Sequence, residues 1–239
     1  SFQINTDSLQ TNAVFDYETK NSYAICIKTD DSNGGTYEEN FTITVTNVIE
    51  TLTLTLRSVG AYDGHILESG ANTNIGGSFD KIATTFHLGD EAGDKQYRAV
   101  LSFNTAGLPD NAGITRILLK IRKQGQVGTN PFDILGGLKV DIRKPYFDTG
   151  LALAVADFNA AADKSNAATF RATPVYGWYI AVIGATGYPY INLTGTTQFR
   201  LHFLTGDNGD NAADYMKFFS GNYATAAARP TLVIQYYLP

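Results

Sequence analysis

An Asx-rich loop near the carboxyl end has the residue types and spacing of a cation site. In the run Asp207-Asn208-Gly209-Asp210-Asn211-Ala212-Ala213-Asp214, carboxylate and amide oxygens alternate closely, and Gly209 lets the backbone bend. Calcium takes about six to eight hard oxygen ligands, often from a tightly turning chain. We therefore predict calcium ligands at Asp207, Asn208, Asp210 and Asp214. A solvated acidic hairpin loop is the alternative interpretation.

A second group of oxygen-bearing residues lies earlier in the chain. Asp63 precedes an apolar run, and Asn72 and Asn74 follow that run in a glycine- and asparagine-rich turn. Because these side chains offer the same kind of oxygen, we predict Asp63 and Asn74 as ligands of a second calcium site.

Aromatic residues are concentrated in one later segment. Tyr176, Trp178, Tyr188 and Tyr190 are the candidates for carbohydrate binding, since sugars stack on exposed flat rings. On a strand, Tyr176 and Trp178 share one face and Tyr179 takes the other. The apolar residues around them leave a second interpretation open, in which the rings belong to the core or to an interface.

The sequence lacks the residue patterns of known catalytic centres. Its three histidines, His65, His87 and His202, are far apart, and each lies in a strand pattern. There is no Gly-x-Ser-x-Gly elbow, His-Glu-x-x-His motif or phosphate-binding loop. We therefore predict that the protein is not an enzyme.

Composition narrows the class of protein. Net charge is −5 and only 17% of the 239 residues are charged, so electrostatic attraction to nucleic acid is not expected. No run approaches the ~18 apolar residues of a membrane span. A surface built from Thr, Ser, Asn, Gly and Tyr is typical of secreted β-sandwiches, so we predict an extracellular protein. The single cysteine, Cys26, can form no internal disulfide.

The elements that must position these residues are strands. Thr51-Leu52-Thr53-Leu54-Thr55-Leu56 alternates strictly between polar and apolar residues, the period of a strand with one buried face. Many short runs of this kind predict an all-β sandwich or jelly roll over residues 51–239. Only Leu151 to Ala162 is alanine-rich enough to suggest a short helix. The expected strands are 51–58, 64–68, 80–87, 97–103, 114–123, 136–143, 176–183, 188–193, 197–204, 214–219 and 231–237.

Residues 1–50 resemble the second half of a cadherin-like repeat. The matching segments are Phe15-Asp16-Tyr17-Glu18, the strand Tyr23 to Thr29 with Asp30 and Gly34-Gly35, and the strand Thr42 to Val48. The resemblance implies a partial cadherin- or immunoglobulin-like sandwich. It also implies that Asp16, Glu18 and Asp30 occupy positions that bind calcium in that family. The first strands of such a repeat have no counterpart here. Half a sandwich cannot bury its inner face, so we expect the missing strands from upstream residues of a longer protein or from another chain.

Residues 52–239 resemble the DNRLRE-type domain, a carbohydrate-binding-module-like jelly roll of large secreted bacterial proteins. The segments that carry the resemblance are Asp63 to Glu68, Asn72 to Gly76, Tyr97 to Phe103, Leu108-Pro109, Ile114 to Arg122 and Ala228 to Tyr236. The resemblance implies a location outside the cell, on a bacterial surface.

Two functions agree with these observations. The first is a structural or adhesion module of a bacterial surface protein, assembling into filaments by exchange of β-strands with other copies of itself or with adjacent domains. The second is a calcium-supported carbohydrate-binding module of a secreted adhesin or polysaccharide-degrading protein, with a glycan as its partner.

Overall fold

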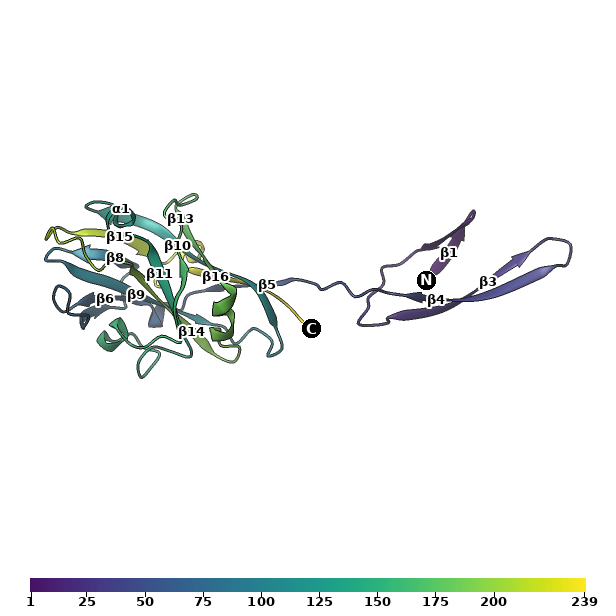
Figure 1. Ribbon diagram of the computed structural model, residues 1–239, viewed down its shortest axis with the longest axis horizontal. Helices are drawn as coiled ribbons and strands as arrows, with labels where there is room; N and C mark the ends of the chain where they lie inside the picture. The colour runs from purple at the N-terminus through teal and green to yellow at the C-terminus, as the bar shows by residue number, and fades with distance from the viewer. The chain divides into compact units, whose positions relative to one another are not determined.

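The computed structural model describes all residues from 1 to 239 and is almost entirely β-structure, with 48% of residues in strands and 8% in helices. This confirms the prediction of an all-β, sandwich-like fold. The chain divides into two compact units, Ser1–Glu50 (unit 1) and Thr51–Pro239 (unit 2) (Figure 1). None of its helices has the length and hydrophobicity that a bilayer span requires.

Unit 1 consists of two β-hairpins that form separate sheets. In the first hairpin, β1 (Phe2–Asn5) pairs with β2 (Ser8–Thr11). In the second, β3 (Ser22–Asp30) pairs with β4 (Thr36–Thr44). The Asp31 carboxylate stabilises the second turn, where it accepts hydrogen bonds from the N–H groups of two turn residues.

A small aromatic cluster joins the two hairpins of unit 1. The ring of Phe15 lies 5.1 Å from that of Phe2 and 4.8 Å from that of Tyr23, measured between centroids. Lys20 places its ammonium group 4.5 Å from the centre of the Tyr23 ring. The three rings are only half-buried, and unit 1 contains no fully buried residue. The two hairpins therefore have no core of their own.

Unit 2 forms one 12-stranded antiparallel sheet that curls into a half-barrel. Its main path runs β12-β11-β14-β9-β8-β15-β10-β16-β5, with β13, β6 and β7 as branches. The strands are β5 (Leu52–Arg57), β6 (Gly64–Glu68), β7 (Gly76–Asp80), β8 (Thr85–Glu91), β9 (Lys95–Asn104), β10 (Gly113–Val127), β11 (Leu138–Arg143), β12 (Lys164–Thr169), β13 (Trp178–Ile183), β14 (Thr196–Phe203), β15 (Asp214–Phe219) and β16 (Thr231–Tyr237). The helices are all short: η1 (Gly60–Tyr62), α1 (Pro131–Ile134), η2 (Val155–Phe158), η3 (Ala185–Tyr190) and η4 (Ala226–Ala228).

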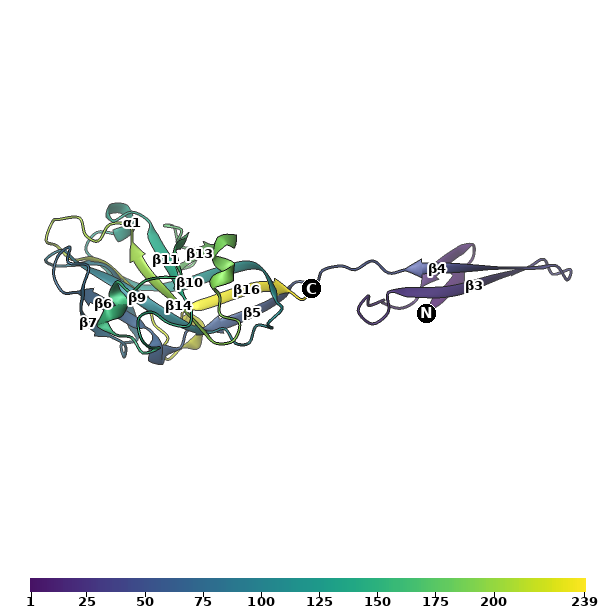
Figure 2. The same cartoon turned by 60° about the horizontal axis from the view of Figure 1, so that its bottom comes forward.

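The long strand β10 links the two groups of strands. Its first part pairs with β16 on one side and with β13 on the other, and its last part pairs with β15. The register of the β10–β15 pairing shifts between Lys123 and Gly125. β5 and β16, the first and last strands of unit 2, pair side by side (Figure 2).

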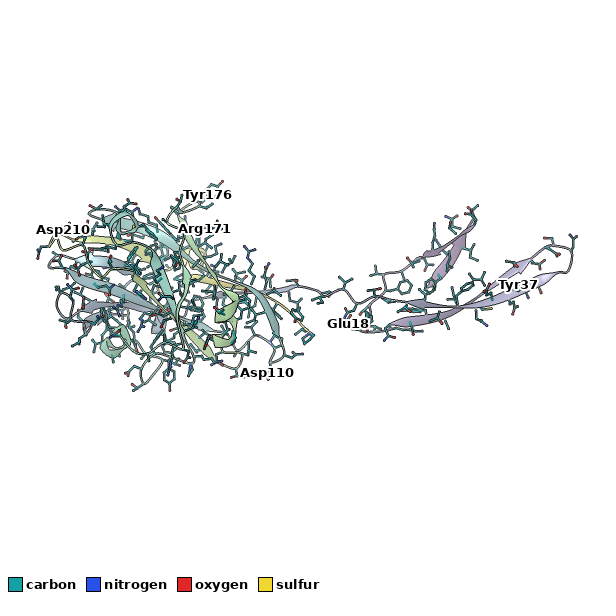
Figure 3. All side chains as sticks on the ribbon, in the orientation of Figure 1. Glu18, Tyr37, Asp110, Arg171, Tyr176 and Asp210 are labelled. Carbon is teal, nitrogen blue, oxygen red and sulfur yellow. The ribbon has the colours of Figure 1, made fainter.

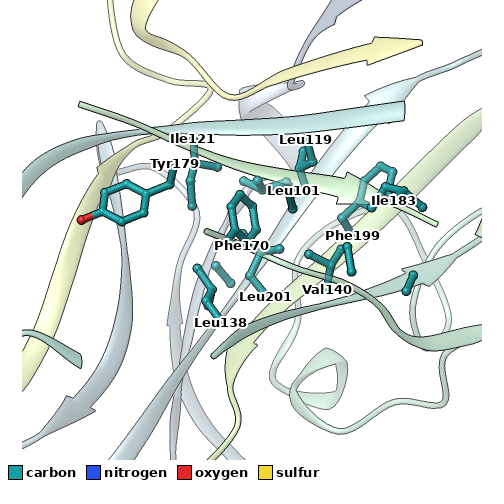
Figure 4. Packing of buried hydrophobic residues seen from close by; sticks show 14 of the residues in the cluster. Leu101, Leu119, Ile121, Leu138, Val140, Phe170, Tyr179, Ile183, Phe199 and Leu201 are labelled. Atoms are coloured by element: carbon teal, nitrogen blue, oxygen red, sulfur yellow. The ribbon is translucent and has the colours of Figure 1, made fainter. Parts of the chain in front are cut away.

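The core of unit 2 lies inside the curl of the sheet. Alternate residues of β9, β10, β11 and β14 point inward, and residues such as Leu101, Leu119, Val140 and Phe199 are fully buried (Figure 4). A second, smaller cluster packs on the opposite side of the sheet, and its members are Ile66, Val100, Phe147, Leu153 and Phe158.

Two of the strands predicted from the sequence are not present as single strands in the structure. Residues 80–87 are not one strand, because the Asp80 carboxylate accepts the N–H groups of Ile82 and Ala83 and makes a turn between β7 and β8. Residues 188–193 include part of η3 instead. Pro189 has no backbone N–H to donate to a neighbouring strand.

Of the short helix expected in residues 151–162, that segment contains only the single 3₁₀ turn of η2. Its buried apolar residues, Leu153 and Phe158, are held by packing on the smaller cluster and do not follow a helical repeat.

Candidate functional site

The Asx-rich loop connects β14 to β15 at one end of unit 2, and Figure 3 shows Asp210 exposed at its tip. Asn208 organises the loop. Its side-chain amide donates to the Asp210 carboxylate at 2.9 Å and lies 3.4 Å from Oδ2 of Asp214, while its Oδ1 accepts the N–H of Asp210 at 3.3 Å. The structure thus brings three of the four residues predicted here into one network. Asp207 has no side-chain hydrogen bond in it.

The structure adds a carboxylate that the sequence analysis missed. Asp90 on β8 lies directly opposite Asp214 on β15 in the antiparallel register. Directly opposed residues of an antiparallel pair point to the same face and lie close together. The two are 0% and 2% exposed. No local motif marks Asp90, because the residue opposite it, Asp214, lies on a strand more than 100 residues later in the sequence.

The two carboxylates differ in their hydrogen bonding. Oδ1 of Asp214 accepts the backbone N–H of Thr129, which follows β10. Neither oxygen of Asp90 has a hydrogen-bond partner, and Asp90 forms no ion pair. Burial, followed by the nearby charge of Asp214, raises the pKa of Asp90 to about 7. A buried, unsatisfied carboxylate of this kind is rare and costly in a folded protein.

The second predicted calcium group is not brought together. Asp63 lies before β6 and Asn74 in the turn after it. The Asp63 carboxylate accepts the N–H groups of Ser102 (2.8 Å) and Gly221 (3.2 Å), and burial raises its pKa to about 7. Asn74 accepts a hydrogen bond from Arg98 instead. Asp63 therefore anchors three segments of the backbone to one another.

No three side chains among the histidines, cysteines, aspartates and glutamates converge in a way that would hold a metal ion by themselves. Any cation at the Asx-rich loop would therefore need amide and main-chain oxygens in addition to carboxylates.

The four predicted sugar-binding aromatics occupy different surroundings. Tyr176 is 94% exposed at a two-residue turn, with φ of 50°, and projects from unit 2 in Figure 3. The Trp178 ring is approached by the Lys120 ammonium group at 5.1 Å. The Tyr188 hydroxyl donates to the carbonyl of Thr115, and Tyr190 closes η3. None of the ring pairs of unit 2 joins two of these four side chains.

Folding brings together two histidines that are distant in sequence. The rings of His65 and His87 stack with centroids 4.4 Å apart, and Tyr97 and Tyr215 pack against the His87 ring. Nδ1 of each histidine is buried without a hydrogen-bond partner. Burial, and then the neighbouring His87, lowers the pKa of His65 to about 4. The arrangement is an uncharged aromatic stack at neutral pH.

Unit 1 contains an apolar groove of about 400 Å³ between its hairpins (the unit 1 groove). Its lining comes from β1, β2 and β3 and consists of Phe2, Gln3, Ile4, Leu9, Ile25, Cys26 and Ile27. Ile4 and Leu9 remain 59% and 40% exposed. Each of the four strands of unit 1 pairs with only one neighbour, so each has one free edge.

No protein-family model matches the chain, and no curated protein is significantly similar to it in sequence. Its function must therefore be inferred from the geometry of the two units.

Proposed function

We propose that the protein is a non-enzymatic structural or adhesion module of a bacterial surface protein, and that unit 1 takes up a β-strand from a second copy of the chain. Repetition of this step joins copies into a filament. One observation carries the proposal: unit 1 has four strands and a groove lined with apolar side chains, yet it buries no residue completely.

The groove has the features that strand addition uses. An incoming strand can satisfy the free N–H and C=O groups of an edge while its alternate side chains enter an apolar slot. The side chains of Ile25 and Ile27 lie on one face of β3 and line the groove, and the edge of β3 opposite β4 is free. Free edges beside exposed apolar residues are otherwise an aggregation hazard, which native proteins cover.

The composition supports an extracellular setting. Charged residues make up only 17% of the chain, and the net charge of −5 disfavours nucleic acid as a partner. A well-packed unit 2 with a continuous sheet would serve as the folded body that the filament displays.

The test compares two lysine substitutions in the full chain. Ile25→Lys places a charge in the unit 1 groove, while Val14→Lys places the same charge at a side chain that is 99% exposed and outside the groove. The size distribution by light scattering and electron microscopy should show oligomers for the unchanged protein and for Val14→Lys, and monomers for Ile25→Lys. A folded monomer at every concentration, with the groove closed to a hydrophobic dye, would refute the proposal.

Carbohydrate binding is the second candidate, and the exposure of Tyr176 favours it. A tyrosine ring that is 94% exposed on a tight turn is available for stacking on a sugar. Tyr176→Asn removes the ring and keeps a residue type that tolerates the positive φ. Glycan affinity that this change abolishes would support the second candidate, and the absence of glycan affinity in the unchanged protein would exclude it.

A further inference from the structure

We propose that Asp90 and Asp214 bind one calcium ion where β8 ends and β15 begins, with further oxygen ligands from the Asp207–Ala213 loop. This inference is independent of the assembly proposed for unit 1, because the residues belong to unit 2 and have no part in the unit 1 groove.

The first argument is the state of the two carboxylates. Asp90 and Asp214 are opposite each other, nearly fully buried and of like charge. Like charges placed directly opposite on a sheet are destabilising, and a buried charge needs a partner. Asp214 has the Thr129 N–H and the Asn208 amide, whereas both oxygens of Asp90 are free to accept a ligand. A cation between them would satisfy Asp90 and remove the repulsion.

The second argument is the set of oxygens around the pair. Three segments meet here: the turn between β8 and β9, the segment after β10, and the Asx-rich loop. Asp94 of the first segment accepts the N–H of Asn211 at 2.9 Å. Gly128 of the second packs so closely on Asp214 and on the carbonyl of Ala213 that a side chain would collide with both. These contacts tie the three segments to one another beside Asp214.

The chemistry of these donors favours calcium over other ions. The ligands are all oxygen, with no sulfur or imidazole, which disfavours zinc and copper. Calcium accepts irregular sets that mix carboxylates with carbonyls, while magnesium demands a regular octahedron and retains several waters. Two carboxylates supplemented by loop oxygens match the ligand set that calcium accepts.

The experiment titrates calcium into the 239-residue chain after removal of metals with a chelator. Calorimetry and terbium luminescence measure binding, and thermal unfolding with and without calcium measures its effect on stability. We expect a Kd of about 10⁻³ M or tighter, the range of extracellular calcium modules. Asp90→Asn, which keeps the side-chain shape, should weaken binding by about tenfold or more because ligand charge sets affinity. Asp110→Asn, the same change at an exposed loop position, should leave binding unaltered.

Two results would overturn the calcium site. One is the absence of both binding and thermal stabilisation in the metal-free protein. The other is an Asp90→Asn variant that is more stable than the unchanged protein with or without calcium, which would mean that a shared proton satisfies the pair. Circular dichroism in chelator establishes that each variant is folded, and Asp214→Asn provides a second variant at the same site. Ile25→Lys should bind calcium normally, so a failure of assembly and a failure of calcium binding are separable.

Discussion

Arg200 on β14 and Asp141 on β11 face each other across paired strands and form a buried ion pair, with Nη2 of the arginine 2.7 Å from Oδ2 of the aspartate. Nη1 of Arg200 also donates to the carbonyls of Asp157 and Ala160. The guanidinium lies 4.8 Å from the centre of the Phe147 ring. One arginine thus connects the sheet to η2 and to the smaller apolar cluster.

Removal of Arg200 should destabilise unit 2 strongly. Arg200→Met leaves Asp141 buried without its main cation, a change that costs about 3–5 kcal/mol in comparable buried pairs. The free energy of unfolding from urea titration measures the effect. Arg171→Met, at an exposed arginine, is the matched control and should change stability by about 0.5 kcal/mol or less. Equal effects of the two substitutions would contradict the structural role given to the pair.

The His65–His87 stack should make the protein sensitive to acid. Burial holds the pKa of His65 at about 4, below its ordinary value of 6.5, so the unfolded chain takes up a proton first as pH falls. The stability that the neutral ring contributes is present above pH 6.5 and is lost as pH falls toward 4.

His65→Phe tests this, because it keeps an aromatic ring in the stack and removes the titrating group. The loss of unfolding free energy between pH 7 and pH 4.5 should be smaller in the variant by about 2–3 kcal/mol. Denaturant titrations at the two pH values measure the difference. If both proteins lose the same amount, the histidine is not responsible for the acid sensitivity.

Gly221 should tolerate no side chain. A Cβ there would lie 2.7 Å from Cα of Gly60 and 2.5 Å from Oδ2 of Asp63, so the backbone of two loops would have to move. We expect Gly221→Ala to lower the melting temperature, at a cost of about 1–3 kcal/mol. Gly150→Ala is the control, because nothing lies within 4 Å of its Cβ position. A melting temperature unchanged by Gly221→Ala would show that the Gly60–Asp63–Gly221 contact is not tight.

Cys26 provides a direct reporter of assembly. It is the only cysteine of the chain, it is exposed, and it lines the unit 1 groove. If a strand of another copy fills the groove, a maleimide should modify Cys26 more slowly as the protein concentration and the oligomer fraction rise. In Ile25→Lys the rate should stay at the dilute value. A rate independent of assembly in the unchanged protein would place the contact elsewhere.

Short apolar and aromatic runs bounded by turn segments could be predicted as strands from the sequence. The expected strands 64–68, 214–219 and 231–237 coincide in this way with β6, β15 and β16. β12 was missed, since its sequence Lys-Ser-Asn-Ala-Ala-Thr has neither alternation nor high β-propensity. Its pairing with β11 comes from tertiary contacts that no local pattern reveals.

The candidate site could be predicted only in part for the same reason. Local composition marked the Asx-rich loop, and Asn208, Asp210 and Asp214 do form one network. Asp90 could not be found, because the segment Gly89-Asp90-Glu91 is typical of a polar turn. Only the pairing of β8 with β15 places its carboxylate beside Asp214 and away from water.

The pairing of β5 with β16 has a consequence for how the molecule is made. β5 is the first strand of unit 2 to leave the ribosome, whereas its only ladder partner is the last. The β5 strand that carries Leu54 and Leu56 therefore lacks its ladder partner until Thr231–Tyr237 has been synthesised. Long-range closure of this kind is slow, and nascent chains with open strands are prone to misassociate. A translation product truncated before Thr231 cannot form this final ladder and is a natural substrate for chaperones.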